Sequence, residues 1–274
     1  MDKRRQNATE RHAQLIALLK AQGYCSVSEM SSMLNVTPMT IRRDLHILSE
    51  KHIIQVTRGG ARFCASKQDE PDFSVRTHEH LAEKQAIGKR VAELFIQEGD
   101  VVGIDSGSTM IEVARNLPDV PLTVVTASLA AANVVARNNR HQLVMLGGVL
   151  QHEASCFYSP QAIGALHTLH INKLFLATAG LLIPDGLSCS NLSDAEVKQA
   201  LINSSRQVIL CADSSKIGKA FLAHFASLDA IHALVTDSGI MTADREVLER
   251  HNVRVIIVPA STTSSPGLSL IKTN

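Results

Sequence analysis

The chain has 274 residues, of which 45% are hydrophobic and 19% charged, so it can form one large domain or a medium and a small one. Because only 3% of its residues are aromatic and Trp is absent, an aromatic cage or a stacking platform for single strands is not expected. No run of about 18 uncharged apolar residues occurs and no apolar signal core opens the chain, so we expect a cytoplasmic protein that is neither membrane-inserted nor secreted.

The formal net charge of +1 hides an asymmetry between two parts of the chain. Residues 1–62 carry ten Lys/Arg and five Asp/Glu, whereas the remaining residues carry seventeen and twenty-one. A basic head on an acidic body indicates that the head meets a polyanion. On charge alone, an ordinary solvated face explains the asymmetry equally well.

The chain is expected to begin with a helix in residues 10–22. Leu15, Leu18 and Leu19 recur there at helical spacing, and Gly23 ends the pattern. These leucines are expected to face a small core.

A second, short helix is predicted to follow. Ser28 is expected to cap it, because a hydroxyl oxygen can accept a hydrogen bond from a free amide of the first turn. Met30, Met33 and Leu34 are its apolar residues, and we expect all three to be buried.

A third helix is predicted to start directly afterwards. Thr37 has the hydroxyl of an N-cap, and Pro38 occupies the first helical position, where a missing N–H costs nothing. Ile41, Leu45 and Leu48 fall at i, i+4 and i+7, so this stripe of the helix is expected to face the core.

The opposite face of the third helix carries polar and basic residues. Arg43, Met39 and His46 point away from the apolar stripe, and Thr40 and Arg42 flank them. Two helices joined by a tight turn, the second with basic residues outward, are typical of the helix-turn-helix that reads double-stranded DNA. A small helical domain with an accidental basic face is the alternative.

A strand and a basic turn are expected after the third helix. Residues 53–57 alternate like a strand, and residues 58–62 (Arg-Gly-Gly-Ala-Arg) are predicted to form the tip of a hairpin, or wing. Lys51, Arg58 and Arg62 suit contacts with phosphates or the minor groove. The residues expected to contact DNA are Thr37, Met39, Thr40, Arg42, Arg43, His46 and Arg58.

Three segments follow from these patterns. Residues 1–62 are predicted to be a winged helix-turn-helix domain. Residues 63–80 are polar, contain Pro71 and show no clean period, so they are predicted to be a linker. Helical spacing resumes in residues 81–97 and opens a larger domain, residues 81–274.

From residue 101 onward, short apolar runs alternate with amphipathic stretches. Strands are predicted at residues 101–104, 122–126, 142–146, 174–177, 208–212, 233–236 and 253–258. Helices are predicted between them at residues 109–117, 128–138, 194–205 and 242–251. This alternation favours an α/β fold of right-handed βαβ units around a mostly parallel sheet. In such sheets the ligand site lies beyond the carboxyl ends of the strands.

Small hydrogen-bond donors follow the first of these strands. Asp105-Ser106-Gly107-Ser108-Thr109 leads into a helix, whose free amides and hydroxyls can bind a phosphate. The segment is not a P-loop, because no Gly-Lys-Ser/Thr follows, and it is not the dinucleotide fingerprint. It is not the Asp-x-Asp motif of aspartyl phosphotransferases either, because Gly107 occupies the position of the second acid. A helix cap without a ligand is the alternative for this loop alone.

Other strands end in similar residues. These ends are Thr126-Ala127-Ser128, Gly147-Gly148, Thr178-Ala179-Gly180 and Asp213-Ser214-Ser215-Lys216-Ile217-Gly218. Together they describe a pocket for an anionic, polyhydroxylated small molecule, for which a phosphorylated sugar fits best. The residues expected to bind this effector are Asp105, Ser106, Gly107, Ser108, Thr109, Thr126, Ser128, Gly147, Gly148 and Lys216.

The cysteines and histidines suggest neither a disulfide framework nor a metal site. The five cysteines are scattered without a Cys-x-x-Cys pair, which indicates reduced cytosolic thiols. The pairs His78/His80 and His167/His170 have no nearby Cys and no His-Glu-x-x-His frame, so we expect surface or packing residues. We expect no metal and no cofactor.

Motifs in both parts of the chain point to one family. In the head these are residues 36–45 (Val-Thr-Pro-Met-Thr-Ile-Arg-Arg-Asp-Leu) and 58–61 (Arg-Gly-Gly-Ala). In the body they are Glu83-Lys84, residues 105–109, Gly147-Gly148, Ala179-Gly180 and residues 213–216. With these motifs in order, the chain resembles the DeoR/GlpR family of bacterial sugar-catabolism repressors. The resemblance implies a phosphosugar isomerase-like, effector-sensing and oligomerisation domain in residues 81–274, similar to ribose-5-phosphate isomerase and glucosamine-6-phosphate deaminase.

The chain departs from the family pattern at two places. Ala127 replaces the Asn that usually follows the second strand, which removes an amide that could bond a sugar hydroxyl. Asn172 stands before Lys173-Leu174-Phe175 where the family commonly has Asp, and we interpret this change as structural.

The leading hypothesis is a transcriptional repressor of a carbohydrate catabolic operon, released from its operator by a phosphorylated sugar. Since one helix-turn-helix reads too short a half-site, we expect a homo-oligomer, dimer or tetramer, joined through the sensor body. A sugar-phosphate isomerase or deaminase with a DNA-binding head is the alternative. Its candidate acids and bases are Asp105, Asp213, Glu196 and Lys216. A binding role accounts for all four of these residues, and no separate catalytic pair is left over, so we expect no enzymatic activity. A structural nucleoid protein is also disfavoured, because it would not need a donor-lined pocket.

Overall fold

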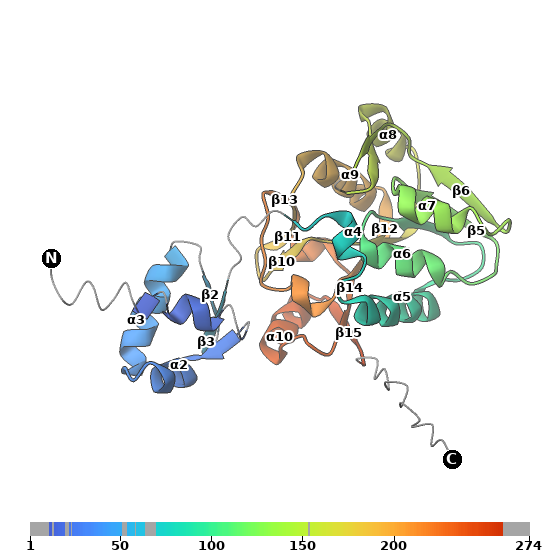
Figure 1. Cartoon of the computed structure of the whole chain (residues 1–274). Helices are drawn as coiled ribbons and strands as arrows, with labels where there is room; N and C mark the ends of the chain where they lie inside the picture. The colour runs from blue at the N-terminus through green and yellow to red at the C-terminus, as the bar shows by residue number, and fades with distance from the viewer. Residues whose placement is uncertain are drawn as a thin grey trace, which may run out of the picture.

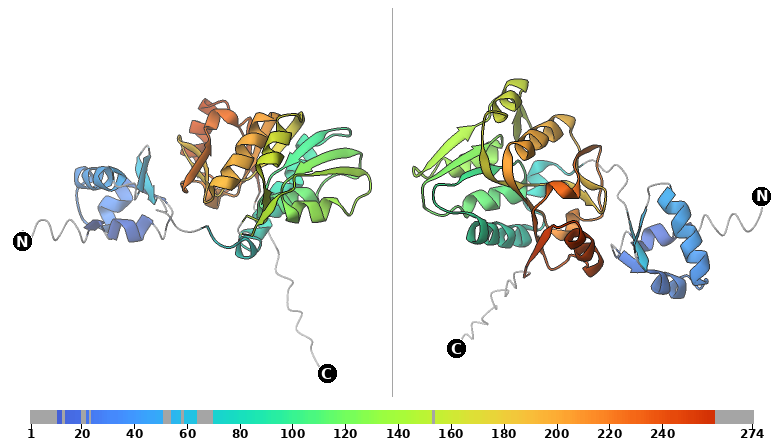
Figure 2. Two further views of the ribbon diagram at one scale, coloured as in Figure 1. Left: turned by 90° about the horizontal axis from the view of Figure 1, so that it is seen from above. Right: turned by 180° about the vertical axis from the view of Figure 1, so that it is seen from behind.

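The computed structural model shows a small head and a larger body joined by a connecting segment (Figure 1). It describes residues 11–12, 14–19, 22, 24–50, 54–57, 59–63, 70–152 and 154–259. Two further views show that the head stands beside one end of the body (Figure 2). No helix in the described ranges is long and apolar enough to cross a membrane.

The head contains a helix-turn-helix and a three-stranded sheet. Residues 11–12, 14–19 and 22 are helical. The elements that follow are β1 (Tyr24–Ser26), α2 (Val27–Met33), α3 (Pro38–Glu50), β2 (Ile54–Thr57) and β3 (Gly60–Phe63). Strand β3 pairs antiparallel with both β1 and β2, and the β2–β3 hairpin is the wing. The predicted winged helix-turn-helix is therefore confirmed.

The apolar stripe of α3 faces the core of the head, as its spacing predicts. Ile41, Leu45 and Leu48 are at most 2% exposed and pack against the first helix, α2 and β2. Burying three large aliphatic side chains contributes several kcal/mol, at about 1.5–3 kcal/mol each. This burial fixes which face of α3 remains outside.

The start of α2 differs from the prediction. The N-cap is Ser26 rather than Ser28, and it forms a capping box with the first turn of the helix. Met30 is fully buried and Leu34, one turn later, packs beside it. Met33 is 59% exposed, because only the i, i+4 stripe of this short helix faces the core. The prediction that Met33 is buried is wrong.

The body is an α/β fold around a seven-stranded parallel sheet. The strand order is β15–β14–β12–β9–β4–β5–β6, and every neighbouring pair is parallel. The strands are β4 (Val101–Ile104), β5 (Leu122–Thr126), β6 (His141–Met145), β9 (Ile171–Leu176), β12 (Ser205–Cys211), β14 (Ala233–Asp237) and β15 (Arg254–Val258). All seven predicted strands are present, and β4 and β5 have the predicted bounds.

Helices cover both faces of this sheet (Figure 1). On one face lie α5 (Leu81–Phe95), α6 (Ser108–Arg115) and α7 (Leu129–Val135), and on the other α8 (Pro160–Leu166), α9 (Leu192–Asn203) and α10 (Thr242–Arg250). Within β9, Phe175 packs in the first layer, whereas Leu174 and Leu176 pack in the second. The sheet is thus buried on both sides, as a parallel sheet requires.

Several short elements lie outside the predicted pattern. They are β1, α8, α4 (Phe73–Arg76), β7 (Val149–Gln151), β8 (Cys156–Tyr158), β10 (Gly180–Leu182), β11 (Gly186–Cys189), β13 (Ala223–Ala226) and the 3-10 turns η1 (Ser214–Lys216) and η2 (Leu228–Ala230). β7 pairs with β8, and β10, β11 and β13 form a third small sheet. Strands of three or four residues are too short to show a period of two in the sequence.

The direction of winding changes between β4 and β9. The chain runs outward from β4 to β6 on one side of the sheet, and from β9 to β15 on the other. The two strands are neighbours, with Ile104 opposite Phe175, so the loops at their carboxyl ends diverge from a common point. Open α/β sheets bind ligands at such a point.

A buried ion pair joins the wing to the body. Arg62 in β3 is 5% exposed, and its guanidinium bonds the carboxylate of Asp244 in α10. Gly218 lies against the same side chain, since a Cβ there would come within 2.5 Å of the Cδ of Arg62. Arg62 therefore faces the body, which contradicts the interpretation of this residue as a DNA-facing residue of the wing.

Candidate functional site

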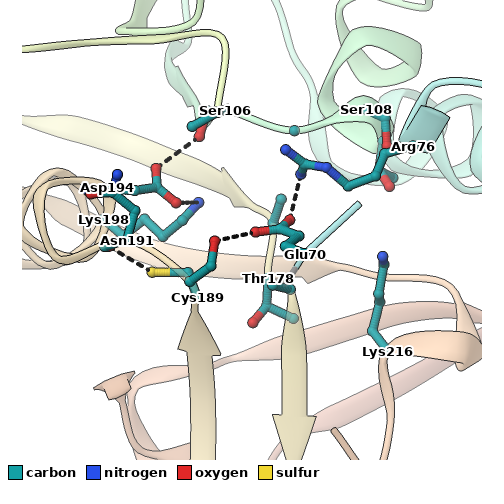
Figure 3. A pocket seen from close by; sticks show the side chains of 16 residues that line it. Glu70, Arg76, Ser106, Ser108, Thr178, Cys189, Asn191, Asp194, Lys198 and Lys216 are labelled. Carbon is teal, nitrogen blue, oxygen red and sulfur yellow. Dashed lines mark hydrogen bonds and ion pairs between the residues drawn. The ribbon is translucent and has the colours of Figure 1, made fainter. Parts of the chain in front are cut away.

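A narrow cavity lies at the carboxyl ends of β4 and β9, where the winding of the sheet predicts a ligand site (Figure 3). Its wall comes from the connecting segment, the loops after β4, β7 and β9, the start of α9, and η1. The lining residues are Glu70, Arg76, Ser106, Gly107, Ser108, Thr109, Ala154, Ala177, Thr178, Ala179, Cys189, Ser190, Asn191, Asp194, Lys198 and Lys216. Segments far apart in the sequence thus meet around one space.

The start of α6 presents backbone donors to this cavity. Gly107 is the N-cap with φ 139°, a conformation that favours glycine, and no side chain caps the helix. Ser108 and Thr109 form the first turn, whose amides have no acceptor within the helix. These free amides and the positive end of the helix dipole suit an anion.

Lys216 adds a full positive charge from η1. Among the described residues its ammonium makes no ion pair, so the charge is available to a ligand. Asp237 holds η1 in place by accepting hydrogen bonds from the amide (2.6 Å) and hydroxyl (2.8 Å) of Ser214. Burial alone would raise the pKa of Asp237, but hydrogen bonds from Ser214 and Gly239 outweigh it and keep this pKa below its usual value.

Arg76 is fixed at the cavity by the short helix α4. Its Nε donates to the carbonyl of Pro71 at 2.9 Å, and the guanidinium lies 5.4 Å from the centre of the Phe73 ring. The fully buried Lys84 donates from Nζ to the carbonyls of Arg76 and Glu79, at 2.5 Å each. Burial lowers the pKa of Lys84. Lys84 therefore anchors the end of α4 and, through it, the guanidinium.

A buried ion network forms the inner wall. Lys198 is 3% exposed, and its Nζ lies 2.5 Å from Asp105 and 3.6 Å from Asp194. Burial alone would lower the pKa of Lys198, but the two carboxylates outweigh it and raise this pKa, so the ammonium stays charged. Ser106 donates to Asp194 at 3.1 Å, and the amide of Ala177 donates to Asp105 at 3.0 Å.

The structure brings together half of the residues predicted to bind the effector. Ser106, Gly107, Ser108, Thr109 and Lys216 all line the cavity. The carboxylate of Asp105 lies directly behind them and acts on the cavity through Lys198. Its second oxygen, Oδ1, is buried without a hydrogen-bond partner among the described residues.

Thr126 and Ser128 are absent from the cavity wall. The Thr126 hydroxyl donates to the carbonyl of Ile104 at 2.6 Å, which ties β5 to β4. The Ser128 hydroxyl accepts from the amide of Ala131 at 3.2 Å and caps α7. Both side chains are fully buried, so the fold itself uses the hydroxyls that the sequence offers.

Gly147 and Gly148 also lie outside the cavity wall. A Cβ at Gly148 would lie 2.3 Å from the carbonyl oxygen of Tyr158, and φ there is 143°. The carbonyl of Gly147 accepts a hydrogen bond from Ser159 at 3.2 Å. The close backbone approach that these glycines allow is therefore made by the end of β8.

The sequence did not indicate several of the lining residues. Glu70, Arg76 and Ser190 come from segments without a period, and Asp194 and Lys198 lie on α9. The available signal for the last two was their i, i+4 spacing as an acid–base pair on one helix face. For the others no local pattern distinguishes a pocket residue from a loop residue.

The two departures from the family pattern fall in structural positions. Ala127 is 2% exposed and packs in the core, away from the cavity wall. Asn172 accepts a 2.7 Å hydrogen bond from the amide of Val101. The neighbouring Lys173 pairs with Asp100 at 2.6 Å.

The head presents an exposed face on α3. Thr37, Met39, Arg42, Arg43 and His46 are exposed on it, and Thr40 is half-buried. Met39 is 71% exposed, a large value for an apolar side chain, and it adjoins the two arginines. Arg58 and Lys51 lie outside the described residues.

Asp44 connects this face to the first helix. It is 4% exposed and accepts hydrogen bonds from Arg11, at 2.6 and 3.1 Å, and from His12, at 3.0 Å. Burial alone would raise the pKa of Asp44, but these partners outweigh it and lower the pKa. The acid that follows the two exposed arginines is thus a structural anchor.

Two family models match the chain, one for each part. Residues 11–67 match the DeoR-like helix-turn-helix domain, and residues 79–238 match the DeoR C terminal sensor domain. Together the two matches span the head and most of the body.

Curated relatives align with the chain over nearly its whole length. The uncharacterized HTH-type transcriptional regulator YulB of Bacillus subtilis is 36% identical over 92% of this chain and 97% of its own. The putative aga operon transcriptional repressor of Escherichia coli O157:H7 is 30% identical over 94% and 96%. The glycerol-3-phosphate regulon repressor of Escherichia coli K12 is 29% identical over 90% and 98%. A solved ribose 5-phosphate isomerase from Methanocaldococcus jannaschii aligns with 49% of this chain and 53% of its own, at 15% identity and a TM-score of 0.37, which supports no argument about function.

Proposed function

Because the chain belongs to the DeoR family of DNA-binding transcriptional regulators, we propose that it acts in the cytoplasm as the repressor of a carbohydrate catabolic operon. Binding of a phosphorylated sugar releases it from its double-stranded operator. The observation that carries this proposal is the cavity between β4 and β9, where the uncapped start of α6 and the cations Arg76, Lys198 and Lys216 surround one space. No metal or cofactor is part of the proposal.

The outward face of α3 supports DNA recognition. Arg42 and Arg43 are exposed, while Ile41 and Leu45 on the opposite side hold the helix on its core. A helix in the major groove reads bases with such outward side chains and contacts phosphates with flanking ones. Arg43, opposite the core stripe, is the residue we assign to base edges or adjacent phosphates, and the exposed Met39 suits an apolar contact beside it.

The effector's phosphate is assigned to the start of α6. Two amides from Ser108 and Thr109 and the ammonium of Lys216 supply the donors and the charge that a phosphate requires. The polar wall of the same cavity, with Asn191 and Asp194, suits the hydroxyls of a sugar. The name of the glycerol-3-phosphate regulon repressor agrees with a phosphorylated polyol as the class of effector.

The chemistry of the cavity supports binding rather than catalysis. Burial and the nearby charge of Asp194 raise the pKa of the Cys189 thiol to about 12, so it is no nucleophile near neutral pH. Lys198 is held in its charged form by two carboxylates, and Asp105 is tied to it at 2.5 Å. A general base must be free to take a proton from the substrate, and neither group is.

The chain is proposed to act as a homo-oligomer. One winged helix-turn-helix reads only a few base pairs, so two heads on a two-fold axis are needed to select an operator. We assign DNA binding to residues 1–62, the linker to residues 63–80, and effector sensing and oligomerisation to residues 81–274. The operator should then contain half-sites separated by about 10 base pairs or a multiple of that distance.

A gel-shift experiment with the full chain tests the proposal. The probe is the promoter DNA beside the gene, titrated at fixed salt with a panel of phosphorylated sugars and their unphosphorylated counterparts. We expect a shift that one phosphorylated sugar reverses and that its unphosphorylated counterpart leaves in place. An isomerase and deaminase assay on the same panel should show no turnover. A chain that converts a sugar phosphate but shifts no promoter DNA would contradict the proposal.

A further inference from the structure

We propose that Glu70 is an internal occupant of the effector pocket, whose carboxylate takes the place of the effector's anionic group on Arg76 and Ser190 and must be displaced when the effector binds. This inference rests on the proposed function and adds the step by which pocket occupancy reaches the head. It assigns Arg76 and Ser190 to anion binding, and Glu70 to the control of access.

Both carboxylate oxygens of Glu70 are bound at the cavity. Oε1 lies 2.5 Å from Nη1 of Arg76, and Oε2 accepts a 2.8 Å hydrogen bond from the Ser190 hydroxyl. The side chains of Arg76 and Glu70 are 11% and 13% exposed, so the pair is largely removed from water. Figure 3 shows Glu70 beside Arg76, with Lys198 on one side of the cavity and Lys216 on the other.

The two sides of this contact are anchored unequally. Arg76 is held by Pro71 and Phe73, and the end of its helix is held by the buried Lys84. For Glu70, the ion pair and the Ser190 hydrogen bond are the only polar interactions of the side chain among the described residues. Glu70 can therefore leave while the guanidinium keeps its position.

A phosphate is the stronger ligand for this set of donors. Glu70 carries one negative charge and two acceptor oxygens, and it makes no ion pair with Lys216 in the described part of the chain. A sugar phosphate carries nearly two charges and three free oxygens, enough to engage Arg76, Lys216 and the start of α6 together. An effector that reaches all three can replace the carboxylate, whereas a neutral sugar cannot.

Because Glu70 lies between the head and the body in the chain, its replacement by the effector changes how the head is attached to the body. Residues 64–69 connect it to β3 of the wing, and Arg62 in β3 is itself bound to Asp244 of the body. With Glu70 in the pocket, the chain is tied to the body on both sides of residues 64–69. Effector binding removes one of these two ties. The effector thereby has a different affinity for the tied and the released arrangement, which is what a ligand needs in order to shift an equilibrium.

Phosphate binding to the full chain tests the proposal. Inorganic phosphate is titrated by calorimetry against the wild type, Glu70→Gln, Glu70→Ala and the control Asp72→Asn. Asp72 is an exposed acid two positions away without a side-chain cap contact, so its substitution removes the same charge but no pocket occupant. We expect both Glu70 variants to bind phosphate about tenfold more tightly than the wild type, because no carboxylate competes, and the control to match the wild type.

Further variants show where the phosphate binds, and they distinguish failure of the displacement from failure of the proposed function. Adding Lys216→Ala to Glu70→Gln should abolish the gain in phosphate affinity, because Lys216 binds the phosphate in the pocket. If the phosphate were instead bound at the basic head, Lys216→Ala would leave its affinity unchanged. Phosphate should also raise the melting temperature of the Glu70 variants more than that of the wild type. If Glu70→Gln and Glu70→Ala bind phosphate, but no more tightly than the wild type, the proposed effector pocket is retained and the proposed displacement of Glu70 is wrong. If no folded variant binds phosphate or any sugar phosphate, the proposed function fails with it.

Discussion

The head and the body place their charged residues in opposite ways. On α3 of the head, Arg42 and Arg43 are exposed, and apolar residues hold the other side of the helix. In the body, Lys84, Lys198 and Asp105 are at most 3% exposed, and each is bound to other groups of the fold: Lys84 to backbone carbonyls, Lys198 and Asp105 to each other. The difference follows from the ligands: a DNA surface is met by exposed cations, whereas a small anion must be enclosed.

This contrast predicts where substitutions act. A substitution on the outer face of α3 should change DNA affinity and leave folding intact, because no buried contact is lost. A substitution in the buried ion network of the body should cost folding energy first, because a buried charge without its partner is expensive.

The largest effect is expected for Lys198→Met. The substitution removes the cation 2.5 Å from Asp105, which is 1% exposed, and leaves that carboxylate buried and unpaired. We expect the free energy of unfolding to fall by about 3–5 kcal/mol. Chemical denaturation of the full chain measures this. Lys198→Met combined with Asp105→Asn should recover part of the loss, and a single variant as stable as the wild type would show that the network is not structural.

A smaller effect, confined to the head, is expected for Asp44→Ala. Asp44 accepts hydrogen bonds from Arg11 and His12, and losing them should cost about 1.5–3 kcal/mol. The head should unfold at lower denaturant concentration, while the transition of the body stays in place. Circular dichroism and a probe in each part distinguish the two transitions, and a shift of both would contradict the assignment of Asp44 to the head alone.

The stability of the head should also depend on pH through Asp44. The pKa of this carboxyl is lowered in the folded chain from its ordinary value of 3.8. Its stabilising contribution is therefore fully present above that ordinary value and is lost as the pH falls through the lower, folded value. Denaturation midpoints of the wild type and Asp44→Ala should converge at low pH, and a constant gap across the acid range would contradict this.

A loss of binding without a loss of folding is expected for Arg43→Ala. The side chain is exposed on α3, so the free energy of unfolding should change by less than about 0.5 kcal/mol. Specific operator binding should weaken by about 1–3 kcal/mol. Arg140→Ala is the matched control, since Arg140 is a 54% exposed arginine of the body. Equal operator affinities for both variants at fixed salt would remove Arg43 from the interface.

The smallest effect is expected for Met33→Ala. Met33 is 59% exposed, so its truncation should change stability by less than about 0.5 kcal/mol. Met30→Ala, in the same helix but fully buried, should cost about 2–5 kcal/mol. Thermal unfolding of the two variants compares them directly, and similar melting temperatures would contradict the register of α2.

The sequence predicts the helices and strands of both parts better than it predicts the pocket. The core stripe of α3 follows from residues three and four positions apart, and Ile41, Leu45 and Leu48 are buried as expected. The seven parallel strands are predicted because each is an apolar run bounded by turn residues. Both signals are local, so they can be read without knowing the fold.

The pocket depends on contacts between distant segments, which no local pattern records. Lys198 and Asp105 are 93 positions apart, and Ser190 and Glu70 are 120 apart. Hydroxyls at strand ends are ambiguous as well. The Thr126 hydroxyl bonds Ile104 within the fold, whereas the chemically similar Thr109 faces the cavity. Only the sheet order decides which strand end meets the ligand.

Release of the protein from its operator by the effector tests the central claim most directly. Fractional operator binding is measured against the concentration of the sugar phosphate that releases the wild type, for the wild type, Lys216→Ala and the exposed control Lys89→Ala. Lys216 lies at the cavity and far along the chain from α3, so Lys216→Ala should bind the operator normally but require a much higher effector concentration for release. The control should follow the wild type. Coincident release curves for all three proteins would show that the cavity between β4 and β9 is not the effector site.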